Sequence, residues 1–182
     1  MTETFTSVWM EQAQAAIDAG TEYLFSFNEP DIASQANLSP EAAAAGWKQY
    51  MEPFAGKAKL VAPAVSNSAT PGQGLSWLSA FMAACDGCTF SAVNQHWYDS
   101  TSNDISYFQQ QISQAASQSG LPVFVGEFGF IGDDTEIASA LTQAMAWMDG
   151  EDSVVGYAYY FLSDGFLLDG TTPSPYGLAY LA

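Results

Sequence analysis

The segment Tyr23-Leu24-Phe25-Ser26-Phe27-Asn28-Glu29-Pro30-Asp31 decides how the rest of the sequence is interpreted. Its two phenylalanines fall on one face of an extended chain, with Leu24 and Ser26 on the other, which is typical of a half-buried strand. Pro30 cannot donate to a sheet ladder and biases Glu29 toward an extended backbone. We therefore expect a strand that ends at Asn28-Glu29, with both side chains directed beyond its tip.

A later segment, Leu121-Pro122-Val123-Phe124-Val125-Gly126-Glu127-Phe128-Gly129, has the same form. An apolar strand again reaches a glutamate, and we expect Gly129 to end it. The two strand-end carboxylates are separated by helix-forming sequence. Such a pair is what glycoside hydrolysis requires, one carboxyl group as acid/base and one as nucleophile.

The composition limits the classes of partner. The 182 residues suffice for one domain with a substantial core. Three lysines, no arginine and 20 acidic residues give a net charge of −17, so nucleic acid and anionic membranes are excluded as expected partners. A neutral sugar is indifferent to this field and can stack on the aromatic residues, which make up 14% of the chain.

No apolar run approaches the roughly 20 residues of a membrane span, and no cleavable signal peptide is visible in the first residues. Cys85 and Cys88 flank Asp86-Gly87, a turn sequence, which favours a small structural disulfide, with two free thiols as the alternative. With a single histidine in the chain we expect no metal site, and nothing in the sequence requires a cofactor.

The order of elements predicts the fold class. Helices are expected over 4–19, 39–51, 75–84, 104–118 and 134–148, and strands over 22–27, 59–63, 90–98, 122–127 and 154–161. The tail 163–182 is expected to be a loop with a short final segment around 176–181. Strict alternation predicts a parallel sheet covered by helices, and polar strand ends favour a (β/α) TIM-type barrel with its site at the carboxyl ends of the strands.

Only five strands are visible, whereas a TIM barrel has eight. The sheet is therefore either open or an incomplete barrel, and the helix that begins the chain and feeds a strand favours the second. We expect residues 1–182 to form a single catalytic domain with the last five barrel strands, the first three being missing from this chain. A doubly wound open sheet would have a Gly-rich first turn, which is absent.

At this point a specific resemblance appears. The run Phe27-Asn28-Glu29-Pro30-Asp31 resembles the Asn-Glu-Pro signature that ends the fourth barrel strand of clan A glycoside hydrolases. From about residue 20 onward the chain resembles the catalytic core of glycoside hydrolase family 128, which contains β-1,3-glucanases, many of them fungal. The segments that carry this resemblance are Gln35 to Glu41 with Trp47, Leu60 to Ala64, Trp77-Leu78 with Phe81, His96-Trp97-Tyr98 and Gly126 to Gly129.

The resemblance implies roles for the polar residues at the strand ends. Glu29 matches the acid/base and Glu127 the nucleophile. Asn28 would hydrogen-bond the sugar 2-hydroxyl. His96 or Tyr98 would orient the nucleophile, although a lone histidine can equally be structural.

Three further residues are candidates for substrate binding. Trp97 and Tyr159 are candidate sugar platforms, with core packing as the alternative. Asn94 is a candidate polar group of the cleft. The tryptophans on the expected helices, Trp9, Trp47, Trp77 and Trp147, are assigned to the core.

The function expected from the resemblance is a retaining, endo-acting β-1,3-glucan hydrolase that acts as a monomer, outside the cell or in the cell wall. Its partner is β-1,3-glucan or a related neutral polysaccharide. One alternative is a catalytically inactive glucan-binding remnant. Another is a clan A glycosidase of different specificity, such as a β-1,4-glucanase or a mannanase.

Overall fold

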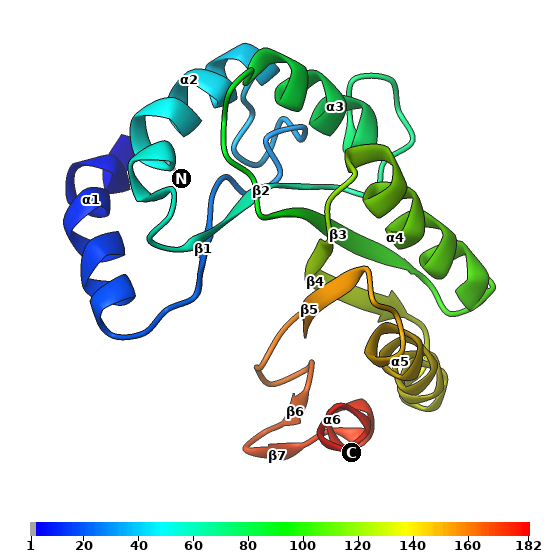
Figure 1. Ribbon diagram of the computed structural model, residues 1–182. Coiled ribbons are helices and arrows are strands. Elements are labelled where there is room, and N and C mark those ends of the chain that lie inside the picture. The colour runs from blue at the N-terminus through cyan, green and yellow to red at the C-terminus, as the bar shows by residue number, and fades with distance from the viewer. Residues whose placement is uncertain (1–2) are drawn as a thin grey trace.

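The computed structural model describes residues 3–182, which form a curled half-barrel of five parallel strands (Figure 1). The strands lie side by side in the order of the sequence, β1-β2-β3-β4-β5. They are β1 (Tyr23–Phe25), β2 (Lys59–Val65), β3 (Ala92–Ser100), β4 (Val123–Ile131) and β5 (Val154–Tyr159). The α/β class and the parallel sheet predicted from the alternation are therefore confirmed.

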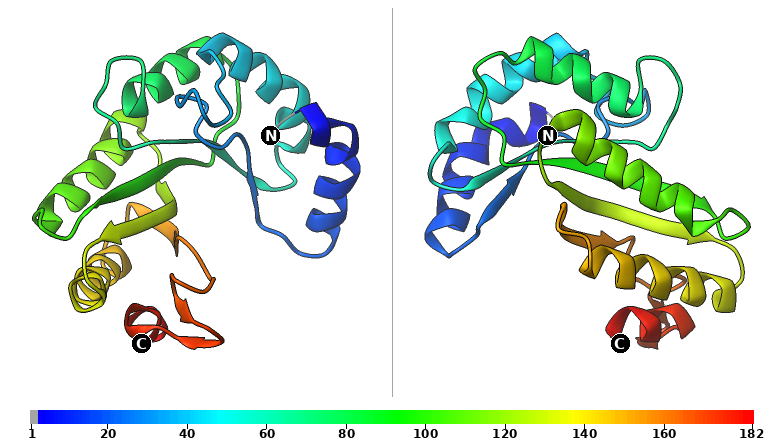
Figure 2. Two further views of the ribbon diagram at one scale, coloured as in Figure 1. Left: turned by 180° about the vertical axis from the view of Figure 1, so that it is seen from behind. Right: turned by 45° about the vertical axis from the view of Figure 1, so that its right-hand side comes forward.

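The long helices form an arc along the outer side of the sheet (Figures 1 and 2). They are α1 (Glu3–Asp18), α2 (Pro40–Tyr50), α3 (Gly74–Ala84), α4 (Ile105–Ser119) and α5 (Asp134–Asp149), with a 3-10 turn η1 (Glu52–Phe54) after α2. Beyond β5 a small hairpin, β6 (Leu168–Asp169) and β7 (Thr172–Pro173), leads into α6 (Pro175–Leu181).

Local sequence explains where these helices begin. The Ser39 side chain accepts a hydrogen bond from the backbone N–H of Ala42 at the start of α2. Asp133 and Glu136 form a reciprocal capping box at α5. Such caps satisfy backbone donors that have no partner inside the helix, and each contributes about 1 kcal/mol.

The core lies between the sheet and the helices. Trp47, Phe81, Phe108 and Phe128 are almost fully buried there, and Trp77 stacks on Phe81 with ring centroids 5.5 Å apart. Each large apolar side chain buried in this way stabilises the fold by roughly 1.5–3 kcal/mol. This layer holds the strands, and hence their carboxyl ends, in fixed positions.

The concave side of the sheet is open between the edge strands β1 and β5 (Figure 1). As predicted, both edges expose apolar side chains: Phe25 and Val155 are each 39% exposed. A cavity of about 430 Å³ lies on this side, lined in part by Phe25, Phe124 and Ala158.

The first strand is shorter than expected, and its two phenylalanines do not share a face. Phe25 packs edge-on against Phe124 with ring centroids 4.8 Å apart, whereas Phe27 lies against Gly46 of α2. The strand ends at Phe25, and pairing with β2 resumes only at the bridge between Asn28 and Ala64. The alternation predicted over 22–27 is wrong because the backbone leaves the ladder in between.

The expectation that β4 ends at Glu127 is also wrong. The strand continues to Ile131, and Gly129 pairs with Tyr98 of β3 inside the ladder. A Cβ atom at Gly129 would lie 3.2 Å from the Tyr98 ring. Glycine therefore serves a close approach between a ring and a strand here.

Cys85 and Cys88 are joined by a disulfide directly after α3, with Cα atoms 5.5 Å apart. This separation lies within the range that a disulfide requires. None of the helices in the described part of the chain combines the length and the apolar character needed to cross a membrane.

Candidate active site

Glu29 lies just beyond β1 and has a left-handed backbone, with φ at +43°. The extended conformation that Pro30 was expected to favour is therefore not adopted. Two hydrogen bonds fix the turn: the Glu29 N–H donates to the Ala64 carbonyl (2.9 Å), and the Ile32 N–H donates to the Glu29 carbonyl (3.0 Å). A non-glycine residue in this region is strained, and such strain is concentrated at functional sites.

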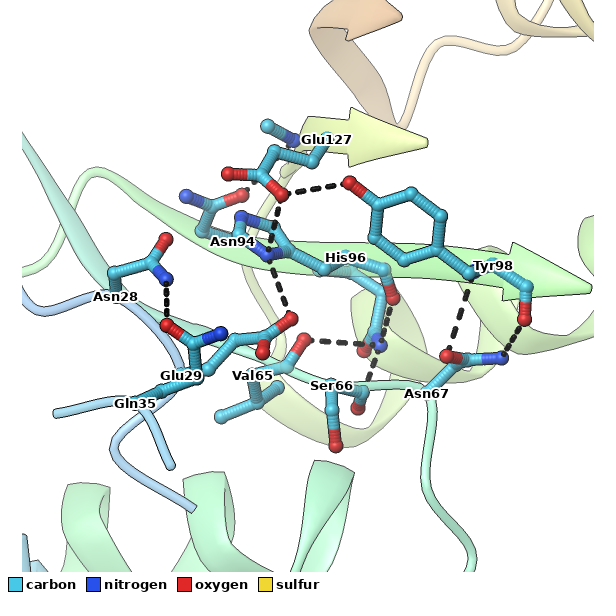
Figure 3. A network of polar contacts seen from close by, with 12 residues as sticks. Asn28, Glu29, Gln35, Val65, Ser66, Asn67, Asn94, His96, Tyr98 and Glu127 are labelled. Atoms are coloured by element: carbon cyan, nitrogen blue, oxygen red, sulfur yellow. Dashed lines mark hydrogen bonds and ion pairs between the residues drawn. The ribbon is translucent and has the colours of Figure 1, made fainter. Parts of the chain in front are cut away.

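His96 brings the two glutamates together (Figure 3). Its Nδ1 atom lies 3.0 Å from Oε1 of Glu29 and 3.5 Å from Oε2 of Glu127. Because both oxygens contact one nitrogen, they are at most about 6.5 Å apart. The imidazole is buried, while the Glu29 and Glu127 side chains keep 14% and 32% of their surface exposed.

Tyr98 holds the second carboxylate from the other side. Its hydroxyl donates to Oε2 of Glu127 over 2.7 Å (Figure 3). Burial, together with this hydrogen bond and the negative charge of Glu127, raises the pKa of the Tyr98 hydroxyl. The hydroxyl thus stays a proton donor that fixes the position of the carboxylate.

Strand register explains this grouping. His96 pairs directly with Glu127 in the β3–β4 ladder, and Tyr98, two residues further along β3, points to the same face as His96. Trp97 lies between them and points to the opposite face, where it is buried against Phe108. The interpretation of Trp97 as a sugar platform is therefore corrected: it is a core residue.

The two asparagines occupy different positions. Asn94 is buried and lines the concave cavity, and its Oδ1 accepts a hydrogen bond from the Gly126 N–H (3.0 Å). A Cβ atom at Gly126 would come within 2.5 Å of this amide, so the glycine makes room for it. Asn28 is exposed beside Glu29, and its amide donates to Gln35 (3.3 Å).

Tyr159 is only 8% exposed and packs edge-on against Phe128. It lines a second cavity, of about 370 Å³, together with Tyr98, Tyr160 and Phe166. Of these rings, Tyr160 and Phe166 are the more exposed, at 40% and 37%. Tyr160 follows β5 directly, inside the strand expected over 154–161, and Phe166 lies in the tail that was expected to be a loop. The sequence singled out neither ring.

Asp31 has a structural role that the sequence did not reveal. Its carboxylate is buried and accepts hydrogen bonds from the N–H and hydroxyl of Ser66 and from the N–H of Gly74. It therefore fastens both ends of the loop after β2 beside the turn that carries Glu29. Among the described residues no group of three or more His, Cys, Asp or Glu side chains is placed to hold a metal ion.

Comparisons with known proteins agree with this geometry. Residues 2–180 match the family model described as glycosyl hydrolase catalytic core. A curdlan-specific exo-β-1,3-glucanase of glycoside hydrolase family 128 from Blastomyces gilchristii has a similar structure, with a TM-score of 0.91 and 39% identity over 97% of this chain and 77% of its own. An endo-β-1,3-glucanase of the same family from Amycolatopsis mediterranei, solved as a glutamate-to-alanine variant with laminaripentaose, gives a TM-score of 0.80 and 31% identity over 97% and 78% of the two chains.

A curated relative is Alkali-sensitive linkage protein 1 of Schizosaccharomyces pombe, which is 31% identical over 157 residues. These residues cover 80% of this chain but only 28% of that protein. The match of the family model over nearly the whole chain, and the identity to the Blastomyces gilchristii glucanase over most of both lengths, establish the relationship. The chain belongs to the glycosyl hydrolase catalytic core family and, within it, to glycoside hydrolase family 128.

Proposed function

We propose that this protein hydrolyses β-1,3-glucan with retention of configuration, using Glu29 as acid/base and Glu127 as nucleophile. The observation that carries the proposal is the contact of both carboxylates with one nitrogen of His96. In the first step the Glu127 carboxylate attacks the anomeric carbon while Glu29 gives its proton to the departing glycosidic oxygen. In the second step Glu29 takes a proton from water, which attacks the same carbon and releases Glu127.

The spacing of the carboxylates favours retention over inversion. A retaining pair has its carboxyl groups about 5–5.5 Å apart, whereas an inverting pair needs about 6.5–9.5 Å to admit a water. The oxygens that face His96 are at most about 6.5 Å apart, a close approach that supports the retaining assignment.

We take the substrate class from the solved relatives named above. The Blastomyces gilchristii enzyme is described as curdlan-specific, and structures of the Amycolatopsis mediterranei enzyme hold laminari-oligosaccharides. Two variants of the latter each lack one glutamate, and these positions are 97 apart in its sequence. Glu29 and Glu127 are 98 positions apart (127 minus 29), which supports the same pairing here.

We also propose that the five strands correspond to the last five of an eight-stranded barrel. The two open edges, the cavity between them and the greater length of the solved relatives support this correspondence. Endo action, a monomeric state and a location outside the cell or in the cell wall belong to the same proposal. The Cys85–Cys88 disulfide supports an oxidising compartment.

The test is an assay of reducing ends released from laminarin by the 182-residue protein, with cellulose and mannan as parallel substrates. We expect release from laminarin alone, and no release by Glu127→Gln. Binding of laminarin without release would instead support a catalytically inactive glucan-binding remnant. Release mainly from cellulose or mannan would overturn the substrate class, and the length distribution of the first products separates endo from exo action.

A further inference from the structure

A groove of about 460 Å³ lies on the outer surface between α3 and α4, apart from the site of the glutamates. These two helices are neighbours in the outer arc (Figures 1 and 2). Although the chain carries 20 acidic residues, none of the described residues that line the groove is charged. The polar lining comes mainly from Ser68, Gln73, Tyr107, Gln110, Gln114 and Gln118.

One face of α4 supplies most of this surface. Tyr107, Gln110, Gln114 and Gln118 are spaced by three or four residues, so their side chains share a face, while Ile112 and other apolar residues of α4 face the core. At a rise of about 1.5 Å per residue, the row from Tyr107 to Gln118 is about 16 Å long. The groove is therefore elongated, and suits a chain of sugar rings better than a single small molecule.

The glutamine side-chain amides of α4 differ in whether they are hydrogen-bonded within the protein. The Gln118 amide donates to Ser79 of α3 (2.8 Å), and that of Gln111 donates to the Asn67 carbonyl (3.4 Å). The side chains of Gln110 and Gln114 have no hydrogen-bond partner among residues 3–182. Each presents a donor and an acceptor to solvent, the combination that pairs with a hydroxyl group.

Tyr107 supplies an aromatic surface at one end of the row. Its ring is 43% exposed and is braced edge-on by Trp97, with centroids 4.9 Å apart. The face of an aromatic ring is electronegative and attracts the polarised C–H groups of a sugar ring. The buried Trp97 thus has a structural purpose, because it holds Tyr107 in place.

We propose that this groove is a second, non-catalytic binding site for neutral carbohydrate. The choice of β-1,3-glucan as its ligand rests on the proposed function. Amide groups without charge, two serines and one exposed ring match a polymer of uncharged hydroxyl-bearing rings. An anionic or cationic ligand would find no opposite charge in the lining.

The position of the groove relates it to the candidate active site. Ser68 and Gln73 lie in the loop after β2, and Tyr107 lies in the first turn of the helix after β3. Both connections follow the carboxyl ends of strands, which is the face on which Glu29 lies. Asp31, two residues after Glu29, fastens this loop at Ser66 and Gly74. One end of the groove is therefore tied to the rim of the site, where it can retain a polymer that the site cleaves.

The test compares retention of laminarin by variants built on Glu127→Gln, which prevents turnover. We expect the double variant Gln110→Ala/Gln114→Ala to bind laminarin about tenfold more weakly in affinity electrophoresis, because two hydrogen bonds to the sugar are lost. Gln109→Ala/Gln143→Ala is the matched control, since both glutamines lie on outer helices but outside the groove. Tyr107→Ala provides a second variant that removes the ring.

A direct readout keeps the result independent of folding and of the catalytic site. On addition of laminarihexaose, the side-chain amide NMR signals of Gln110 and Gln114 should shift, and those of Gln109 and Gln143 should not. Equal retention of laminarin by all variants, with unshifted amide signals, would overturn the second site. Reducing-end release by the unsubstituted protein distinguishes the two proposals. If the groove variants bind laminarin more weakly but the unsubstituted protein releases no reducing ends, only the proposed function is wrong. If reducing ends are released but the groove variants retain laminarin as well as the control does, only the proposed second site is wrong.

Discussion

The contact of His96 with both Glu29 and Glu127 is the central feature at the scale of single residues. The sequence identifies the glutamates, because each follows an apolar strand. The role of the histidine depends on register, since only the pairing of β3 with β4 places it directly beside Glu127. Its neighbour Trp97 shows the same dependence, because one step along the strand turns a side chain from the site into the core.

The hydroxyl of Tyr98 gives a first prediction. Tyr98→Phe should lower kcat for laminarin by about 10- to 100-fold, because a hydrogen bond to a charged group contributes about 1.5–3 kcal/mol. The measurement is steady-state kinetics beside Tyr157→Phe, which removes a hydroxyl bonded to Asp149 away from the site. An equal decrease of kcat in the two variants would show that the Tyr98 hydroxyl has no specific role in catalysis.

The division of roles between the glutamates gives a second prediction. Glu29→Gln should slow cleavage of laminarin by at least about 100-fold, because the departing oxygen of a natural sugar needs a proton. A dinitrophenyl β-glucoside has a leaving group that needs no acid, so its first step should be nearly unaffected. Glu127→Gln should abolish both reactions. A uniform loss in Glu29→Gln would contradict its role as the acid.

At the scale of elements, the sequence predicts the order and number of parallel strands, because apolar runs and helical periodicity alternate without ambiguity. It fails where a tertiary contact overrides the local pattern. Gly129 would end an isolated strand, yet β4 continues through it because the Tyr98 ring occupies the space of a side chain. The hairpin of β6 and β7 consists of two-residue strands, too short for any period to be seen.

Glu52 in the turn η1 gives a prediction on pH and stability. Its partial burial alone would raise the pKa of this carboxyl, but hydrogen bonds from Thr89 and Trp47 outweigh it and lower the pKa below the ordinary 4.5. A carboxyl whose pKa is lower in the folded state stabilises the fold above about pH 4.5, and this contribution disappears as the pH falls through the folded pKa.

Glu52→Gln should therefore lower the free energy of unfolding at pH 7, and its difference from the unsubstituted protein should shrink at pH 3. Urea unfolding at both values measures this, with Glu11→Gln on α1 as a control. A difference that stays constant between the two pH values would show that Glu52 acts through packing and not through its charge.

At the scale of the whole molecule, the net charge of −17 leads to a prediction about how activity depends on salt and on a polyanion. Because a glucan is uncharged, kcat/KM for laminarin hydrolysis should change less than about twofold between 0.05 and 0.5 M NaCl. The charges of the protein are screened much more strongly at the higher salt concentration. The polyanion heparin should not compete. A steep dependence on salt, or inhibition by heparin, would indicate a charged ligand and a different function.

The curled sheet brings strands distant in sequence to one face, so that Glu29 and Glu127 both contact His96. The stereochemistry of the first product tests whether Glu127 acts as the nucleophile. Proton NMR in the first minutes of laminarin hydrolysis distinguishes the anomers before they interconvert. We expect the β-anomer to appear first, through a covalent intermediate on Glu127. An initial α-anomer would mean inversion by a water and would contradict the assignment of Glu127 as nucleophile.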